Sequence, residues 1–108
     1  MDVKVLFQGP VIEIDGVRYN HHPNGGGLVA ETAQVAGTAY VGPFARVYDN
    51  AQVRGNARIC GRARIYCDAE VFGNARVYGN AQVSGDARVY GDARIYGDRK
   101  VSTGCVTG

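Results

Sequence analysis

The sequence predicts an all-β protein in which short strands wind into a parallel solenoid and stack coil on coil. A branched aliphatic residue recurs at every sixth position without a slip, from Val29 to Val101. The hexads repeatedly carry Gly-Asn or Gly-Asp, which break helices and favour turns. Six residues are not a multiple of the helical turn, so the repeat is not helical. A fixed short period means that each unit buries its apolar face only against its neighbours.

Each hexad supplies one short strand and one corner. In Ala75-Arg76-Val77-Tyr78, small, polar, apolar and polar residues alternate, which is the period of a strand with Ala and Val facing inward. The following Gly-Asn pair turns the chain, since both residues tolerate a positive φ. Three hexads close a triangular coil of about 18 residues, and coils stack at a strand spacing of about 4.8 Å. Residues 27–106 therefore predict about 4.5 coils.

The first ten residues are set apart from this repeat. Residues 5–10, Val-Leu-Phe-Gln-Gly-Pro, resemble the recognition site of a viral processing protease that is used to remove purification tags. We therefore interpret residues 1–10 as a tag-derived tail and exclude them from functional reasoning. The remaining length predicts one domain. No apolar run of about 18 residues occurs, so no membrane partner is expected.

Residues 11–26 are expected to form an N-terminal hairpin and a Gly-rich loop. Residues 11–19 alternate apolar and polar around an Asp-Gly pair, which predicts a hairpin that covers the open end of the first coil. The loop at residues 20–27 holds both histidines of the chain, His21 and His22. Adjacent histidines without further ligands at a metal-binding spacing indicate a solvated linker and not a metal site.

Residues 18 positions apart stack directly, which predicts three aliphatic ladders inside the solenoid. The first side carries Val29, Val47, Ile65, Val83 and Val101, the second Val35, Val53, Val71 and Val89, and the third Val41, Ile59, Val77 and Ile95. An alanine takes the inward position near each corner, from Ala33 to Ala93. The prism is too narrow there for a larger side chain.

The outward positions of the third side form the candidate functional surface. Two columns stack there: Arg58, Arg76 and Arg94 in one, and Cys60, Tyr78 and Tyr96 in the other. No outward strand residue on this side is acidic, so the surface is a candidate for binding a phosphate-bearing ligand or nucleic acid. The alternative is repeat consensus, because Arg-aliphatic-Tyr also recurs on the other sides and suits strands. The net charge of +2 is too small to indicate a nucleic-acid partner by itself, and none is expected.

No metal or cofactor is expected at the corners. Asn50 stacks above Asp68 and Asp86, and such carboxylates can bind calcium. The Gly-Gly-x-Gly-x-Asp pattern of calcium-binding repeats is absent, however. Turn formation explains the Asn and Asp residues, because they satisfy their own backbone at corners.

The cysteines predict free thiols. Cys60 points outward by register, Cys67 lies at a corner, and Cys105 falls where an inward alanine is expected. None of the three pairs with another at the 18-residue spacing, and the count is odd. We therefore expect a reducing compartment, the cytoplasm.

The repeat is similar to the left-handed parallel β-helix of hexapeptide-repeat proteins. Tyr40-Val41-Gly42-Pro43-Phe44-Ala45-Arg46-Val47 resembles coils of the acyltransferase branch, whereas the Ala-Arg-Val-Tyr-Gly-Asp units look more like bacterial and prophage repeat proteins labelled polymer-forming or as transferases. The resemblance covers about three quarters of the chain. It implies a left-handed coil, and homotrimers are common among these proteins. It implies no single function, since this fold serves both catalysts and inert spacers.

The residues do not supply the active site that the acyltransferase branch implies. That branch uses a histidine in a cleft between subunits, often near a loop that bulges from a coil, and the zinc carbonic anhydrases of this fold need three histidines. Residues 29–101 contain neither an insertion nor a histidine. We therefore expect a non-enzymatic rigid spacer or oligomerisation module that forms trimers by side-to-side packing. An acyltransferase-like fragment with an incomplete active site, and an anion-binding or nucleic-acid-binding module, stay as alternatives.

The end of the chain departs from the repeat. After Asp98 the pattern loosens, and residues 107–108 follow without a polar cap. An open solenoid end exposes apolar rungs and unpaired backbone groups. The prophage-type proteins that the repeat resembles continue from a similar Gly-Cys segment into a small C-terminal domain. We expect a β-helix that was excised from a longer bacterial or phage protein, without that C-terminal domain. A phage particle is a second expected location.

Overall fold

The computed structural model of the chain describes residues 12–14 and 16–107. The expected tag-derived tail, Asp15 of the expected hairpin turn and Gly108 lie outside the described residues. The described part contains sixteen strands, most of them two residues long, and no helix. No helix in this part is long and apolar enough to cross a membrane.

Three parallel stacks of strands form the walls of a solenoid, and we number them as the first, second and third sheets. The first contains β3 (Leu28–Ala30), β6 (Arg46–Val47), β9 (Arg64–Ile65), β12 (Gln82–Val83) and β15 (Lys100–Val101). The second contains β4 (Gln34–Val35), β7 (Gln52–Val53), β10 (Glu70–Val71), β13 (Arg88–Tyr90) and β16 (Cys105–Thr107). The third contains β5 (Tyr40–Val41), β8 (Arg58–Ile59), β11 (Arg76–Val77) and β14 (Arg94–Ile95).

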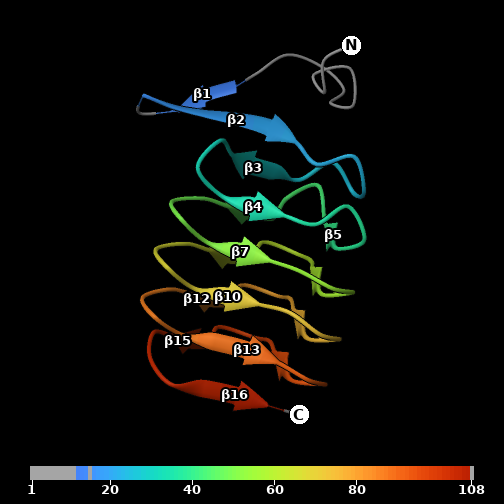
Figure 1. The fold of residues 1–108 in the computed structure, drawn as a ribbon, viewed down its shortest axis with the longest axis vertical. Coiled ribbons are helices and arrows are strands. Elements are labelled where there is room, and N and C mark those ends of the chain that lie inside the picture. Colours follow the sequence, from blue (N-terminus) through green and yellow to red (C-terminus); the bar gives the residue numbers. More distant parts are fainter. Residues whose placement is uncertain (1–11, 15, 108) are drawn as a thin grey trace.

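These stacks confirm the predicted fold class. Five, five and four parallel strands correspond to between four and five coils, in agreement with the predicted 4.5. The chain crosses the near side of Figure 1 from left to right along β4, β7, β10, β13 and β16 and returns along the more distant side. Because it descends from the N-terminus as it does so, the winding is left-handed.

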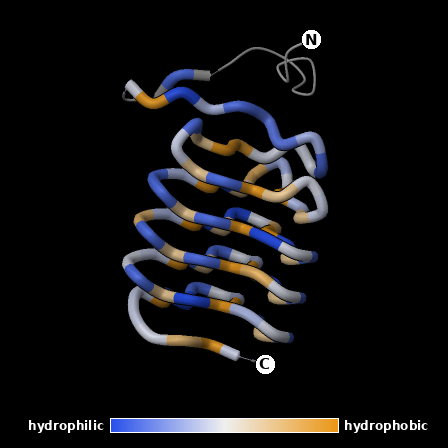
Figure 2. Tube along the Cα trace, in the orientation of Figure 1, coloured by the Kyte–Doolittle hydropathy of each residue, from blue (hydrophilic) through white to orange (hydrophobic). Residues whose placement is uncertain are grey.

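The predicted aliphatic ladders form the core. The partners along each sheet are the expected residues, for example Val47 with Ile65 on the first sheet and Val77 with Ile95 on the third. The ladder residues from Val41 to Ile95 are fully buried, with the corner alanines beside them. Val29 and Val35 are only half-buried, since they belong to the first coil. Figure 2 shows the resulting alternation of apolar and polar residues along the coils.

From Asp49 onward, the corners are made by residues in the left-handed backbone region. At most corners this residue is glycine, such as Gly79 with φ of 70° and Gly97 with φ of 66°. Asp49 (φ 57°) and Cys67 (φ 59°) are the non-glycine exceptions among the described residues. The Cys67 backbone N–H donates a hydrogen bond of 3.1 Å to Oδ2 of Asp49 in the preceding coil.

The predicted N-terminal hairpin is present and extends the first sheet. Strands β1 (Ile12–Ile14) and β2 (Val17–His21) pair antiparallel, and β2 pairs antiparallel with β3. Tyr19 of β2 is buried and packs edge-on against Tyr48, with ring centroids 6.5 Å apart. The hairpin therefore supplies the missing neighbour of the first coil on one of its three sides.

The loop after the hairpin is a second cap, and the expectation of a solvated linker at residues 20–27 was wrong. Residues 20 and 21 belong to β2, and the His22 side chain is 5% exposed. The Val41 N–H donates to the carbonyl of Asn24, and the Gly27 N–H donates to the carbonyl of Val41, each at 3.0 Å. The loop thus pairs with the free edge of β5, which would otherwise be unpaired.

A side chain would prevent this approach of the loop to β5. A Cβ atom added at Gly25 would lie 2.2 Å from the Val41 carbonyl oxygen, and one added at Gly27 would lie 2.3 Å from a Val41 methyl carbon. Gly25 and Gly27 are therefore explained by close contact with Val41, and Gly26, where a Cβ would meet nothing, by its positive φ of 82°.

The last coil is one residue shorter than the others, which corrects the predicted position of Cys105. Val89 pairs with Val106, at a spacing of 17 residues, and Arg88 pairs with Cys105. Cys105 therefore occupies the outward position of an arginine and is exposed, whereas the sequence period placed it inward. The turn that ends in Gly104 (φ 79°) omits one residue of the hexad.

Candidate functional site

The three arginines of the third sheet form a column along the solenoid axis. Arg76 pairs in register with Arg58 on one side and with Arg94 on the other, and all three side chains are exposed. Within the described part of the chain, none of them has an ion pair or a side-chain hydrogen bond. Like charges on adjacent strands repel one another, so this column is a site of unbalanced positive charge.

A second column of outward side chains lies beside the arginines. The rings of Tyr78 and Tyr96 stack with their centroids 5.5 Å apart and their planes 14° from parallel. Cys60 continues the column and is half-buried as a free thiol. Burial raises the pKa of the Cys60 thiol, while the positive charges of Arg58 and Arg76 act in the opposite direction. The sequence register predicted both columns correctly.

These columns line a shallow depression. A hollow of about 320 Å³ is bordered by Arg58, Cys60, Arg76, Tyr78 and Arg94. A second hollow of about 600 Å³ is bordered by Asn24, Thr38, Tyr40, Asn56, Arg58 and Cys60. Arg58 and Cys60 border both hollows, so the two lie next to each other along the third sheet and are treated as one surface. We call it the third-sheet groove.

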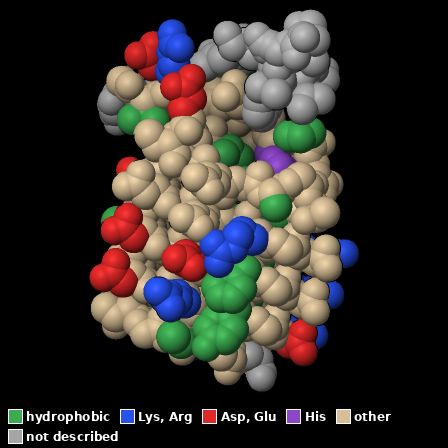
Figure 3. Space-filling model, in the orientation of Figure 1, with side chains coloured by type: hydrophobic (Ala, Val, Ile, Leu, Met, Phe, Trp, Pro, Cys, Tyr) green, Lys and Arg blue, Asp and Glu red, His purple; other side chains and the backbone are tan. Residues whose placement is uncertain are grey.

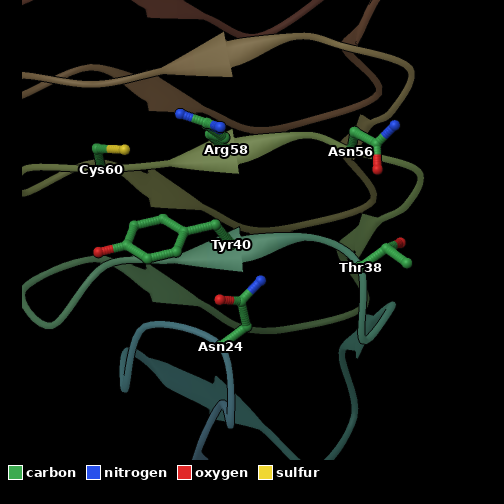
Figure 4. A pocket seen from close by; sticks show the side chains of 6 residues that line it. All are labelled: Asn24, Thr38, Tyr40, Asn56, Arg58 and Cys60. Atoms are coloured by element: carbon green, nitrogen blue, oxygen red, sulfur yellow. The ribbon is translucent and has the colours of Figure 1, made fainter.

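The end of the groove nearest the N-terminus is lined by four neutral polar side chains together with Arg58 and Cys60 (Figure 4). Asn24 reaches up from the capping loop, Tyr40 and Arg58 come from adjacent strands, and Thr38 and Asn56 come from one corner. The Asn24 amide donates a 3.0 Å hydrogen bond to the Ala39 carbonyl, which leaves its own oxygen as an acceptor. Thr38 donates to the Gly55 carbonyl at 2.6 Å and also keeps an acceptor.

On each of the other two sheets, one arginine contacts aromatic or acidic side chains. On the first sheet, Arg46 lies over the rings of Tyr19 and Tyr48, 5.8 Å from each centroid. On the second sheet, Arg54 pairs with Glu70 at 3.2 Å and lies 4.8 Å from the centroid of the Phe72 ring. Figure 3 shows this second face, where basic, acidic and apolar side chains lie together. Arg64 on the first sheet and Arg88 on the second are also exposed and have no ion pair among the described residues, so the third sheet differs in that its unpaired arginines stack on three consecutive strands.

The polar end of the groove was missed in the sequence. Thr38 and Asn56 lie 18 residues apart at one corner, so the register could have placed them beside Tyr40 and Arg58. Asn24 could not have been found in this way, because the capping loop lies outside the repeat. Among the residues that the structure describes, no group of three His, Cys, Asp or Glu side chains could hold a metal ion.

Comparison with known proteins shows that part of the chain is similar to a repeat family. A family model described as the YdcK beta solenoid repeat matches residues 69–85, 81–97 and 87–103. No curated protein and no solved structure matches the chain. The chain is thus similar to a β-solenoid repeat family over residues 69–103, and its likeness to hexapeptide-repeat proteins stays a prediction.

Proposed function

We propose that this β-solenoid repeat protein is a non-enzymatic structural element, a rigid spacer that holds the parts joined to it at a fixed separation. The observation that carries the proposal is the unbroken core, in which every ladder residue from Val41 to Ile95 is fully buried. In such a stack each coil adds the same contacts to its neighbour, so length is set by coil number. A stack of this kind is better suited to holding two joined parts at a fixed distance than to changing its shape.

Spin-label distance measurements would test the spacer function. Labels at Phe44 and Asp98, two exposed positions of one corner column, would report the length of the stack in a variant without the native cysteines. Duplication of residues 70–87 should lengthen the distance by about 5 Å, the spacing of one strand, and keep its distribution narrow. An unchanged distance or a broad distribution would contradict a rigid spacer.

We also propose that the spacer assembles into a homotrimer by side-to-side packing. The stacked pairs Tyr48–Tyr66 and Phe72–Tyr90, each with centroids 5.0 Å apart, support this proposal because they give two flat faces apolar area. The free thiols support a cytoplasmic, reducing location. Light scattering at several protein concentrations should give three times the chain mass. A monomer at all concentrations would refute the trimer. The spacer function would then still be tested by the distance measurement.

A further inference from the structure

We propose that the third-sheet groove binds an acidic oligosaccharide, which lies along the solenoid axis. The inference is independent of the spacer function, since a rigid element can also present a binding surface. It rests on the juxtaposition of three unpaired arginines, a stacked tyrosine pair and a cluster of neutral polar groups along one face.

The shape of the groove selects a linear ligand. Its two hollows share Arg58 and Cys60 and together extend from Asn24 in the capping loop to Arg94 on β14. The lining residues come from all four strands of the third sheet, which cover about 14 Å at the usual strand spacing. A ligand that contacts both ends must therefore be extended, with several units in a row.

The charge of the groove selects an anion. Arg58, Arg76 and Arg94 stand on consecutive strands, exposed and without an acidic partner among the described residues. Guanidinium groups bind carboxylate and sulfate oxygens through paired hydrogen bonds. A chain with an anionic group on successive units can contact successive arginines. Its binding would also relieve their mutual repulsion.

The tyrosine pair disfavours a nucleic acid. A base inserted between two rings needs a separation of about 7 Å, twice the stacking distance of about 3.4 Å. The Tyr78 and Tyr96 centroids are 5.5 Å apart, so no base fits between them. Each ring covers one face of the other, so a base could stack only on an outer face of the pair, such as that of the exposed Tyr96, and the positive edges and hydroxyl groups stay available. This arrangement complements anionic oxygen atoms and not a series of bases.

The polar end of the groove distinguishes a sugar from a simple polyanion. Asn24, Thr38, Tyr40 and Asn56 offer amide and hydroxyl groups and no further positive charge. The Asn56 amide and the Tyr40 hydroxyl have no side-chain partner within the described part of the chain. Such groups match the hydroxyls of a sugar, which both donate and accept hydrogen bonds. A polyphosphate chain carries no comparable donors along its length.

The test is a titration of the intact chain with a fluorescent heparin-derived hexasaccharide, followed by anisotropy at two salt concentrations. We expect saturable binding that weakens with salt, and no binding of the neutral sugar maltohexaose. Arg76→Ala should weaken binding about tenfold, the effect of losing one charged hydrogen-bonded pair. Arg88→Ala is the matched control, because Arg88 is equally exposed but lies on the second sheet.

A second pair of variants tests the polar end. Asn56→Leu should weaken hexasaccharide binding, whereas Asn74→Leu, at the same corner one coil further on and outside the groove, should not. Bound hexasaccharide should also slow alkylation of Cys60 and leave the exposed Cys105 unaffected. Circular dichroism of each variant checks that the fold is intact.

Several results would overturn the proposal. Absence of hexasaccharide binding would do so, as would equal losses from Arg76→Ala and Arg88→Ala or from Asn56→Leu and Asn74→Leu. Equal or tighter binding of inorganic tripolyphosphate, or of a short oligothymidylate, would show that the groove is not selective for sugars.

Discussion

The Nε2 atom of His22 lies 3.0 Å from the carbonyl oxygen of Ala39, and the imidazole N–H donates a hydrogen bond to it. In the next coil the corresponding carbonyl, that of Ala57, accepts instead from the backbone N–H of Tyr40, 17 residues earlier. The His22 ring therefore replaces a backbone donor of a coil that is not there. The cap of the third sheet thus combines this side chain and the Asn24 amide with the two backbone hydrogen bonds of the loop to Val41.

Burial of His22 predicts a pH-dependent stability. Burial lowers the pKa of the imidazole below 6.5, although the hydrogen bond to Ala39 opposes this in part. The unfolded chain therefore binds more protons at mildly acidic pH, and the free energy of unfolding should fall as pH decreases through about 6.5. Urea unfolding between about pH 8 and pH 5.5 would measure the slope. His22→Gln should be less stable at pH 8 but less sensitive to acid. An unchanged slope in this variant would assign the effect to other groups.

Two glycines of one corner column should differ in their tolerance of alanine. Gly79 and Gly97 have nearly the same positive φ, but a Cβ on Gly79 would lie 2.9 Å from the Gly97 nitrogen, and a Cβ on Gly97 would meet nothing within 4 Å. Gly97→Ala should cost about 1 kcal/mol for the backbone conformation alone. Gly79→Ala should cost at least about 1 kcal/mol more, because a backbone contact must shift. Chemical denaturation of both variants measures the difference, and equal losses would refute the close packing of coils.

The narrow interior predicts a graded response to a larger corner residue. Ala69 is fully buried, whereas Ala33 holds the same inward corner position in the first coil and is half-buried. Ala69→Leu should overpack the prism and destabilise it by about 1–3 kcal/mol. Ala33→Leu should cost less, since its side chain can turn toward the open end. A thermal unfolding midpoint lowered equally by both would mean that the first coil is packed as tightly as the others.

The backbone of Cys67 predicts a stabilising substitution. Cys67 takes the corner position that glycine holds in most coils, with φ of 59°. Cys67→Gly removes the cost of this conformation and should stabilise the protein by about 0.5–1 kcal/mol, after allowance for the greater freedom of glycine in the unfolded chain. Cys67→Ala is the control, because it removes the thiol and keeps the Cβ atom. Equal stability of the two variants would contradict the prediction.

Most of the fold could be predicted from the sequence because the repeat period determines which residues stack on one another. Once residues 18 apart are stacked, the ladder from Val41 to Ile95, the arginine column and the Tyr78–Tyr96 pair follow without further information. The rule fails where the period ends. Cys105 was misplaced because the last turn omits one residue, and a constant period cannot indicate an omission.

The caps could not be derived from the period, since they are not part of it. His22, Asn24 and Gly25 fill positions that are defined by what the first coil lacks, and composition alone made them a loop. At the polar end of the third-sheet groove, Asn24 was missed for the same reason, whereas Thr38 and Asn56 lie within the repeat. A sequence signal was present in the run of three glycines, which indicates close backbone contact as readily as freedom.

The hydrogen bonds between coils run along the solenoid axis, since each joins one strand to the strand 18 residues further on, as from Arg58 N–H to the Ala75 carbonyl. A pull applied at the two ends would load these bonds in tension, one coil after another, and not all at once in shear. The protein would then lengthen in equal steps at a low and nearly constant force. A force directed across the axis would instead press the three walls against their aliphatic core and meet much greater resistance. The same stack thus resists a force across its axis and opens coil by coil under tension along it.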